Sequence, residues 1–224
     1  MQLRKQSLMR IAAESGLSLD EEKAVELIEG SWNEHVEQWR KGAVFGAYGA
    51  ARFILGQLIP EAKSLDESSA DRLAASLEDA TSQVGTVVVE GASEAVRAVK
   101  AAGIPTALIC DTGFTPSRHI RTFLEGHNIE LDHLFFSDEV GEPKPSPVIF
   151  RRALEAAGAD AEHSVHIGDL RRTDVAGARA FGMATIRFAG IHDDGWETVE
   201  SKGEEADAVL YRWSELPGLL GIDP

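Results

Sequence analysis

The sequence of 224 residues contains one cysteine, Cys110, and no long hydrophobic run. A single thiol excludes an internal disulfide framework, and such sparse use of cysteine is typical of a reducing compartment. No apolar stretch approaches the roughly 18 residues of a membrane-spanning helix. The N-terminal stretch MQLRKQSLMR also lacks the apolar run and small-residue cleavage site of a signal peptide. These absences predict a soluble, cytoplasmic protein that does not contact a membrane.

Positive charge is scarce as well, because 22 Lys and Arg residues stand against 37 Asp and Glu residues, for a formal net charge of −15. Nucleic acids and anionic membranes are bound mainly through Lys and Arg, so we expect neither as a partner. An anionic small molecule is still compatible with the composition, provided that a divalent cation or a well-placed lysine offsets the negative charge locally.

Motifs of several common enzyme classes are missing. No GxGxxG follows a predicted strand and no GxxxxGK[ST] occurs, which excludes the usual dinucleotide-binding and P-loop sites. The histidines form no HExxH and no GxSxG is present, so zinc-protease and α/β-hydrolase sites are also excluded. His163 and His166 flank a predicted strand, and we expect both to be structural.

The hydrophobic periodicity predicts two modules. Residues 1–85 carry apolar residues at helical spacing, which predicts a small all-helical module with short loops. Residues 86–224 alternate short apolar runs with helical patterns of about ten residues, which indicates βαβ units, a mostly parallel sheet and an α/β fold class. The run 104–110 (IPTALIC) is typical of a parallel strand buried on both faces, and 86–89 (TVVV) is a shorter β-branched run.

Three groups of polar residues follow predicted strands. The segment 110–113 (CDTG) ends the run IPTALIC, and Lys144 is held between two prolines in the turn GEPKPSP. Asp169 and Asp174 follow a strand predicted at 164–167. Ligands of open α/β sheets bind at the edge formed by the carboxyl ends of the strands, so we expect the three groups to lie together there.

The pair Asp169 and Asp174 suits a hard divalent cation. Mg²⁺ usually takes one or two carboxylates, several waters and a substrate phosphate. A simpler alternative is that Asp169 is a turn residue and Asp174 a helix N-cap. Next to a cation, a lysine and the free backbone N–H groups of a turn form a phosphate site. The residues expected to contribute to that site are Cys110, Asp111, Thr112 and Lys144.

From about residue 87 to residue 220, the sequence resembles the phosphatase-like branch of the haloacid dehalogenase (HAD) superfamily. GEPKPSPVIF is similar to the third motif, in which the position of Lys144 neutralises phosphate and nucleophile. GDLRRTDVAGARAFGM is similar to the fourth motif, with Asp169 matching the direct Mg²⁺ ligand and Asp174 the second acid. Residues 1–85 resemble the helical cap, and residues 86–224 the core. The resemblance implies a Rossmann-like, three-layer core with a mostly parallel sheet.

Two departures from the superfamily pattern bear on activity. The second motif normally ends its strand with Ser or Thr, often followed by Asn, whereas Cys110 and Asp111 stand here. A thiol donates hydrogen bonds weakly, and a carboxylate repels phosphate unless a cation or a proton intervenes. The first motif, an apolar strand ending in Asp-x-Asp-x-Thr that supplies the nucleophilic aspartate, is absent.

The resemblance places that absent strand in the middle of the sheet, between the strands at 104–110 and 164–167. Losing about five buried apolar side chains at roughly 1.5–3 kcal/mol each forfeits about 7–15 kcal/mol, which equals the stability of a whole domain. We expect one of three solutions. The chain is an N-terminally shortened product, the segment 85–89 (GTVVV) fills the position, or a second copy covers the exposed strand edges in a homodimer.

The expected activity is that of a Mg²⁺-dependent phosphatase for small phosphorylated molecules, weak or promiscuous because the nucleophile motif is absent. Lys144 and Asp111 are the candidate catalytic residues. Asp111 either replaces the nucleophile or activates a water, or it only shapes the turn while Thr115 caps the next helix. Two other functions stay open: a non-catalytic protein that binds a metal, a phosphate metabolite or a partner, and a 2-haloacid dehalogenase, against which the paired acids argue.

Overall fold

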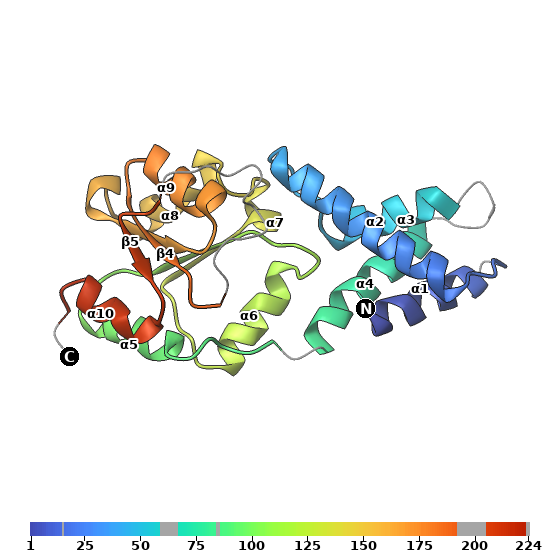
Figure 1. Ribbon diagram of the computed structural model, residues 1–224, viewed down its shortest axis with the longest axis horizontal. Coiled ribbons are helices and arrows are strands. Elements are labelled where there is room, and N and C mark those ends of the chain that lie inside the picture. The colour runs from blue at the N-terminus through green and yellow to red at the C-terminus, as the bar shows by residue number, and fades with distance from the viewer. Residues whose placement is uncertain (15, 59–66, 84–85, 192–204, 223–224) are drawn as a thin grey trace. The chain divides into compact units, whose positions relative to one another are not determined.

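The computed structural model describes residues 1–14, 16–58, 67–83, 86–191 and 205–222. They form two compact units (Figure 1), of which one comprises Met1–Thr86 with Thr112–Ile120 and the other Val87–Asp111 with Arg121–Pro224. The segment Thr112–Ile120 therefore belongs to the helical unit, whereas the sequence had suggested an uninterrupted α/β module from residue 86 onward. Within the described residues, no helix has the length and apolar character needed to cross a bilayer.

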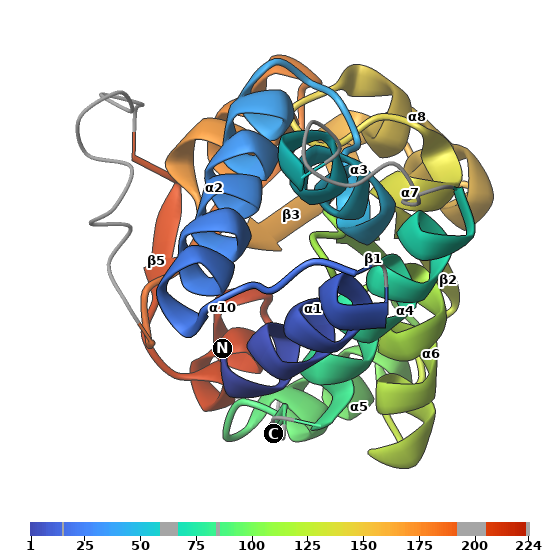
Figure 2. The same ribbon diagram turned by 90° about the vertical axis from the view of Figure 1, so that its right-hand side faces the viewer.

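The helical unit is built from α1 (Gln2–Glu14), α2 (Glu21–Arg40), α3 (Gly46–Leu58) and α4 (Glu67–Gln83), together with the beginning of α6 (Ser117–Gly126). Helix α2 starts after Asp20, whose carboxylate accepts a hydrogen bond from the backbone N–H of Lys23 at 2.7 Å and so caps the helix. Figure 2 shows α1 beside α4, and α2 beside α3.

One hydrophobic core fills this helical unit. Its members recur at helical spacing on the inward faces, and side chains such as Leu8, Ile54 and Leu73 are completely buried. Phe114, from the segment after the first strand, is buried in the same core. Its ring meets that of Trp32 edge to face, with the ring centroids 5.3 Å apart.

The α/β unit alternates helices with short strands. Its strands are β1 (Ala107–Cys110), β2 (His133–Phe136), β3 (Val165–Gly168), β4 (Ala184–Phe188) and β5 (Ala208–Leu210). Its helices are the later part of α6, with α5 (Ala92–Ala101), α7 (Ser137–Val140), α8 (Pro147–Ala157), α9 (Ala176–Ala180) and α10 (Leu216–Leu219). Short helical turns are η1 (Ala161–His163), η2 (Arg171–Val175) and η3 (Trp213–Glu215). Every pair of neighbouring described strands is parallel, which confirms the predicted α/β fold class.

Helices cover both faces of these strands. Helices α5 and α10 pack on one face around Ile186 and Leu210, and α8 and α9 lie on the other face around Ile149 and Phe150 (Figure 1). This is the three-layer, Rossmann-like arrangement that the sequence predicted. The apolar side chains form two separate clusters, however, one on each face.

The sheet itself is divided in two. Strands β1 and β2 form a pair, and β3, β4 and β5 form a second sheet in that order, so that among the described strands β1 does not hydrogen-bond to β3. The interruption lies between the strands that the sequence placed on either side of the absent first motif.

The interruption changes the burial of the neighbouring strands. The run 104–110 was predicted to be buried on both faces, and this prediction is wrong, because Ala107 is exposed, Ile104 is 40% exposed and the rest of β1 is half-buried. The physical reason is that, among the strands that the structure describes, only β2 lies beside β1. The segment 86–89 does not fill the position either: it forms no strand, and Val87 is 79% exposed, while Gly85 lies outside the described residues.

Candidate functional site

The carboxyl end of β3 carries the turn on which the candidate site depends. Gly168 ends the strand, and the chain continues into the π-helical turn η2, in which the backbone N–H of Val175 donates to the carbonyl of Leu170 at 3.2 Å. Turns of this type are often found at functional sites. The turn folds Asp174 back against Gly168, where an added Cβ atom would lie 2.2 Å from Asp174 Cγ. Glycine is therefore required at position 168 for this carboxylate to reach its place.

Asp174 is buried and surrounded by donors. Its Oδ1 accepts from Lys144 Nζ at 2.6 Å and from His166 Nε2 at 2.8 Å, and its Oδ2 accepts from the backbone N–H of Leu170 at 3.2 Å. Burial by itself would raise the pKa of Asp174, but the Lys144 ammonium and the His166 hydrogen bond outweigh it and hold the pKa below its usual value. The group is an anion throughout the physiological range.

Lys144 connects the two half-sheets. Its backbone N–H donates to Asp111 Oδ1 at 2.8 Å, just beyond the end of β1, while its Nζ reaches Asp174 beside the end of β3. Burial would lower the pKa of Lys144, but the charges of Asp174 and Asp111 raise it above its usual value. The ammonium is thus a fixed positive charge, with its side chain only 12% exposed.

The remaining predicted site residues lie at different places. The Cys110 thiol ends β1 and donates to the carbonyl oxygen of Asp111 at 3.7 Å, and burial raises its pKa to about 11. Thr112 is buried and belongs to the helical unit. Asp169 is half-buried and directly follows Gly168. The structure places Lys144 in contact with both Asp111 and Asp174, and Asp169 lies between β3 and the turn that carries Asp174.

His166 was predicted to be structural only, and the structure places it in the site beside Asp174. It lies on β3 two residues before Gly168, so the two positions face the same side of the sheet, and Asp174 packs over that side. Phe150 meets the imidazole edge to face at 5.2 Å between ring centroids. The period of two along β3 was a signal that could have placed His166 beside the carboxylates.

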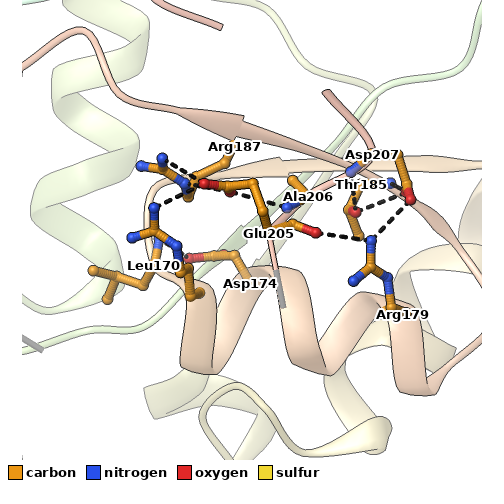
Figure 3. A network of polar contacts seen from close by, with 9 residues as sticks. Leu170, Asp174, Arg179, Thr185, Arg187, Glu205, Ala206 and Asp207 are labelled. Atoms are coloured by element: carbon orange, nitrogen blue, oxygen red, sulfur yellow. Dashed lines mark hydrogen bonds and ion pairs between the residues drawn. The ribbon is translucent and has the colours of Figure 1, made fainter. Parts of the chain in front are cut away.

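A second charged cluster lies next to this site (Figure 3). Arg187 of β4 pairs in register with Gly168, and its guanidinium donates to both carboxylate oxygens of Glu205, at 2.7 and 2.9 Å. Arg171 of the π-helical turn donates to the same carboxylate at 2.8 Å. The hydrogen bond from Arg187 is the main reason why the pKa of Glu205 falls to about 2. This network ties the turn that carries Asp174 to β4.

The side chains that could serve as ligands decide which metal ions, zinc, calcium or magnesium, the site suits. Among the residues that the structure describes, no group of three or more His, Cys, Asp or Glu side chains is placed to hold a metal ion. Structural zinc and calcium sites need such a protein cage. Mg²⁺ needs only one or two carboxylates and completes its octahedron with water and substrate oxygens. Asp169 and Asp174 match in number and type the carboxylates that Mg²⁺ needs, and Asp174 is already engaged by Lys144 and His166.

Comparisons with known proteins point in one direction. Residues 14–182 match the family model described as haloacid dehalogenase-like hydrolase. The mouse haloacid dehalogenase-like hydrolase domain-containing protein 3 is 30% identical over 155 residues, which cover 68% of this chain and 56% of the relative. Glyceraldehyde 3-phosphate phosphatase of Pyrococcus furiosus is 33% identical over 139 residues, covering 60% of this chain and 53% of the relative. The chain thus spans about half the length of these curated relatives.

Solved structures support the same fold. A HAD phosphatase from Thermococcus onnurineus superimposes with a TM-score of 0.62 at 19% sequence identity, covering 99% of this chain and 89% of the other. A 2-haloacid dehalogenase from Pseudomonas syringae gives a TM-score of 0.63, also at 19% identity, and covers 98% of this chain and 90% of the other. Because these structures include both a phosphatase and a dehalogenase, the likeness establishes the fold alone.

Proposed function

The chain belongs to the haloacid dehalogenase-like hydrolases, and we propose that it is a Mg²⁺-dependent phosphatase acting on small phosphorylated molecules. The observation that carries the proposal is the buried Lys144, whose ammonium is held between the ends of β1 and β3 by Asp174. A fixed positive charge at the carboxyl edge of a parallel sheet is suited to binding a phosphoryl group. The glyceraldehyde 3-phosphate phosphatases among the relatives support a small phosphorylated substrate.

The residues divide into binding and positioning roles in this proposal. Lys144 neutralises the phosphoryl oxygens, and the backbone N–H groups of Cys110 and Asp111 at the end of β1 complete the phosphate site. Asp174 orients the Lys144 ammonium through the hydrogen bond at 2.6 Å, and His166 holds Asp174 through its own hydrogen bond at 2.8 Å. Asp169 is the carboxylate proposed to hold Mg²⁺ directly, with Asp174 as the second acid. When bound, Mg²⁺ supplies positive charge that stabilises a transferring phosphoryl group.

Asp111 is proposed to shape the site rather than to attack phosphorus. Its Oδ1 accepts the backbone N–H of Lys144 at 2.8 Å, which fixes the turn that presents the lysine. Asn keeps a side-chain oxygen at this position and can accept the same hydrogen bond. An Asp111→Asn variant is therefore expected to retain phosphatase activity within about threefold, whereas a nucleophile would lose several orders of magnitude.

Turnover of p-nitrophenyl phosphate tests the proposal. We expect Mg²⁺-dependent hydrolysis that chelation with EDTA abolishes, and that Asp169→Asn and Lys144→Met each reduce by at least about 100-fold. Asp71→Asn and Lys41→Met change exposed residues of the helical unit and serve as matched controls that should keep wild-type rates.

Two other results would replace the proposed function. Binding of inorganic phosphate in the presence of Mg²⁺, measured by calorimetry without any turnover, would identify a non-catalytic binding protein. The engagement of both Asp174 oxygens by protein donors is the observation that keeps this second function in view. Release of halide from 2-chloropropionate in the presence of EDTA would identify a dehalogenase.

A further inference from the structure

An aromatic cluster in the helical unit holds the segment that follows β1. The Phe114 ring is buried, and it meets Trp32 and His35 edge to face, with ring centroids 5.3 and 5.6 Å away. The His35 ring also lies 5.1 Å from the Trp32 ring and 6.3 Å from the Phe45 ring, measured between centroids. A Cβ atom added to Gly113 would lie 3.6 Å from His35 Nε2. His35 therefore contacts every other member of the cluster.

The imidazole of His35 suits this place only in its neutral form. The residue is 8% exposed, and its Nδ1 atom is buried without a hydrogen-bond partner among the described residues. A neutral imidazole carries a proton on one nitrogen only, so the other nitrogen loses no more than an acceptor interaction. An imidazolium carries a proton on both nitrogens, and one of them would be a buried, charged donor without an acceptor.

The charged groups near the cluster do not favour an imidazolium. Arg4 of α1 places its guanidinium 5.3 Å from the centroid of the Phe114 ring, which adds a positive charge on that side. The carboxylate of Glu34, which precedes His35 on α2, accepts a hydrogen bond from Gln38 at 2.7 Å. The residues one helical turn from His35 carry no charge: Ser31, Trp32, Gln38 and Trp39. Among the described residues, no carboxylate forms an ion pair with His35, and burial lowers the pKa of His35 below its usual 6.5.

The segment held by this cluster is an excursion from the α/β unit. Residues Thr112–Ile120 belong to the helical unit, and Phe114 is part of the core of that unit. We propose that neutral His35 anchors the segment 112–115 in the helical core, and that protonation of His35 in mild acid releases this segment. An unfolded histidine binds its proton near pH 6.5, so the anchor is at full strength above that pH. It weakens as the pH falls through the lower pKa of the folded state.

Release of the segment would reach the candidate site through the chain itself. Asp111 directly precedes Thr112, and its carboxylate accepts the backbone N–H of Lys144 at 2.8 Å. His35 is thus a positioning residue for the end of β1, a consequence that rests on the proposed phosphatase activity. Between pH 7.5 and pH 5.5, kcat/KM for p-nitrophenyl phosphate should fall at least about threefold more in the wild type than in His35→Phe. Equal falls would show that Asp111 keeps its place without the anchor.

Nuclear magnetic resonance of the full chain tests the anchor without any substrate. The chain is labelled with ¹³C at the histidine rings, and the signal of His35 among the seven histidines is identified by its absence in His35→Phe and His35→Gln. Both variants remove the titrating nitrogens, the first with an aromatic ring retained and the second with a polar side chain retained. We expect His35 to titrate below pH 6.5. Titration at or above pH 6.5 would overturn the proposal.

Amide hydrogen exchange shows which part of the chain is released. After correction for the intrinsic effect of pH, exchange in residues 112–115 should rise about three- to tenfold from pH 7.5 to pH 5.5. The rise should shrink to within about twofold in both His35 variants and persist in His163→Gln, which replaces an exposed histidine of the α/β unit. A rise of the same size in the His35 variants would overturn the proposal, and so would an equal rise throughout α4. These measurements stay decisive even where the proposed activity fails, because they need no turnover.

Discussion

The helical unit and the α/β unit of this protein differ in how continuously their elements are packed. The helical unit has one continuous core, in which Leu8, Ile54 and Leu73 are completely buried. The α/β unit has two smaller clusters, and its strands fall into two separate sheets. A helix makes its backbone hydrogen bonds internally, so a bundle needs only matching side chains. A parallel strand depends on its neighbours for hydrogen bonds as well as for burial, and among the described strands β1 and β3 are not paired with each other, so the sheet is divided.

The largest expected effect breaks the connection between the two half-sheets. Lys144→Met leaves Asp174 as a buried carboxylate without its main cationic partner, and we expect a loss of about 3–5 kcal/mol in unfolding free energy. Urea unfolding in EDTA, followed by far-ultraviolet circular dichroism, measures it. The double variant Lys144→Met with Asp174→Asn should lose at least about 1 kcal/mol less than the single variant, because no charge is then stranded. Equal losses would show that the pair does not hold the half-sheets together.

A matched pair of isoleucines compares the two cores directly. Ile54 is completely buried in the helical unit, and Ile54→Ala should cost about 2–5 kcal/mol. Ile109 is half-buried in β1, and Ile109→Ala should cost about 1 kcal/mol, because less apolar surface is lost to water. Denaturant titration of both variants measures the two losses in unfolding free energy and so gives their ratio. Similar costs would mean that β1 is covered in solution.

A third, smaller effect concerns the close approach of Asp174 to β3. Gly168→Ala places a methyl group within 2.5 Å of three Asp174 atoms, and we expect a destabilisation of about 1–3 kcal/mol with loss of phosphate turnover. Gly126→Ala, where an added Cβ meets no atom within 4 Å, is the control and should change stability little. A tolerated Gly168→Ala would contradict the packing of Asp174 against the strand.

The smallest effect is the pH dependence of the Glu205 network. The pKa of Glu205 is about 2 in the folded chain, chiefly through its hydrogen bond from Arg187, against about 4.3 for an unperturbed Glu. The unfolded chain binds more protons between these values, so the contribution is full above about pH 4.3 and is lost as the pH falls toward 2. Because Glu205 is 43% exposed, we expect less than about 1 kcal/mol between pH 5 and pH 3. In thermal unfolding, the Glu205→Gln variant should not show this loss of stability between pH 5 and pH 3, whereas the Glu22→Gln variant should show it.

Much of the fold was predictable because it depends on local patterns. The apolar run ending at Cys110 is β1, and the strand predicted before Gly168 is β3. Ser146 caps α8 through the backbone N–H of Val148, as its Ser-Pro pair indicates. These features follow from hydrophobic period and capping chemistry alone.

The features that the sequence did not predict share one physical cause, because each of them depends on contacts with residues that are distant in the sequence. The run 86–89 has strand composition, but a strand forms only where an edge is available, and this segment lies between two helices instead. The exposure of β1 depends on a neighbour that the local sequence cannot supply. The hydrogen-bond partners of Asp174 depend on the orientations of the Lys144 and His166 side chains. Only the alternation of side chains along β3 indicated that His166 lies on the side of the sheet where Asp174 packs.

Amide hydrogen exchange of the individual strands tests the divided sheet most directly. Successive amides of a parallel strand point to opposite neighbours, and among the described strands β4 has neighbours on both sides whereas β1 and β3 have one each. A divided sheet predicts slow exchange along all of β4 and alternating slow and fast amides along β1 and β3. Uniformly slow exchange along β1 and β3 in the chain alone would contradict it, because both edges of these strands would then be paired.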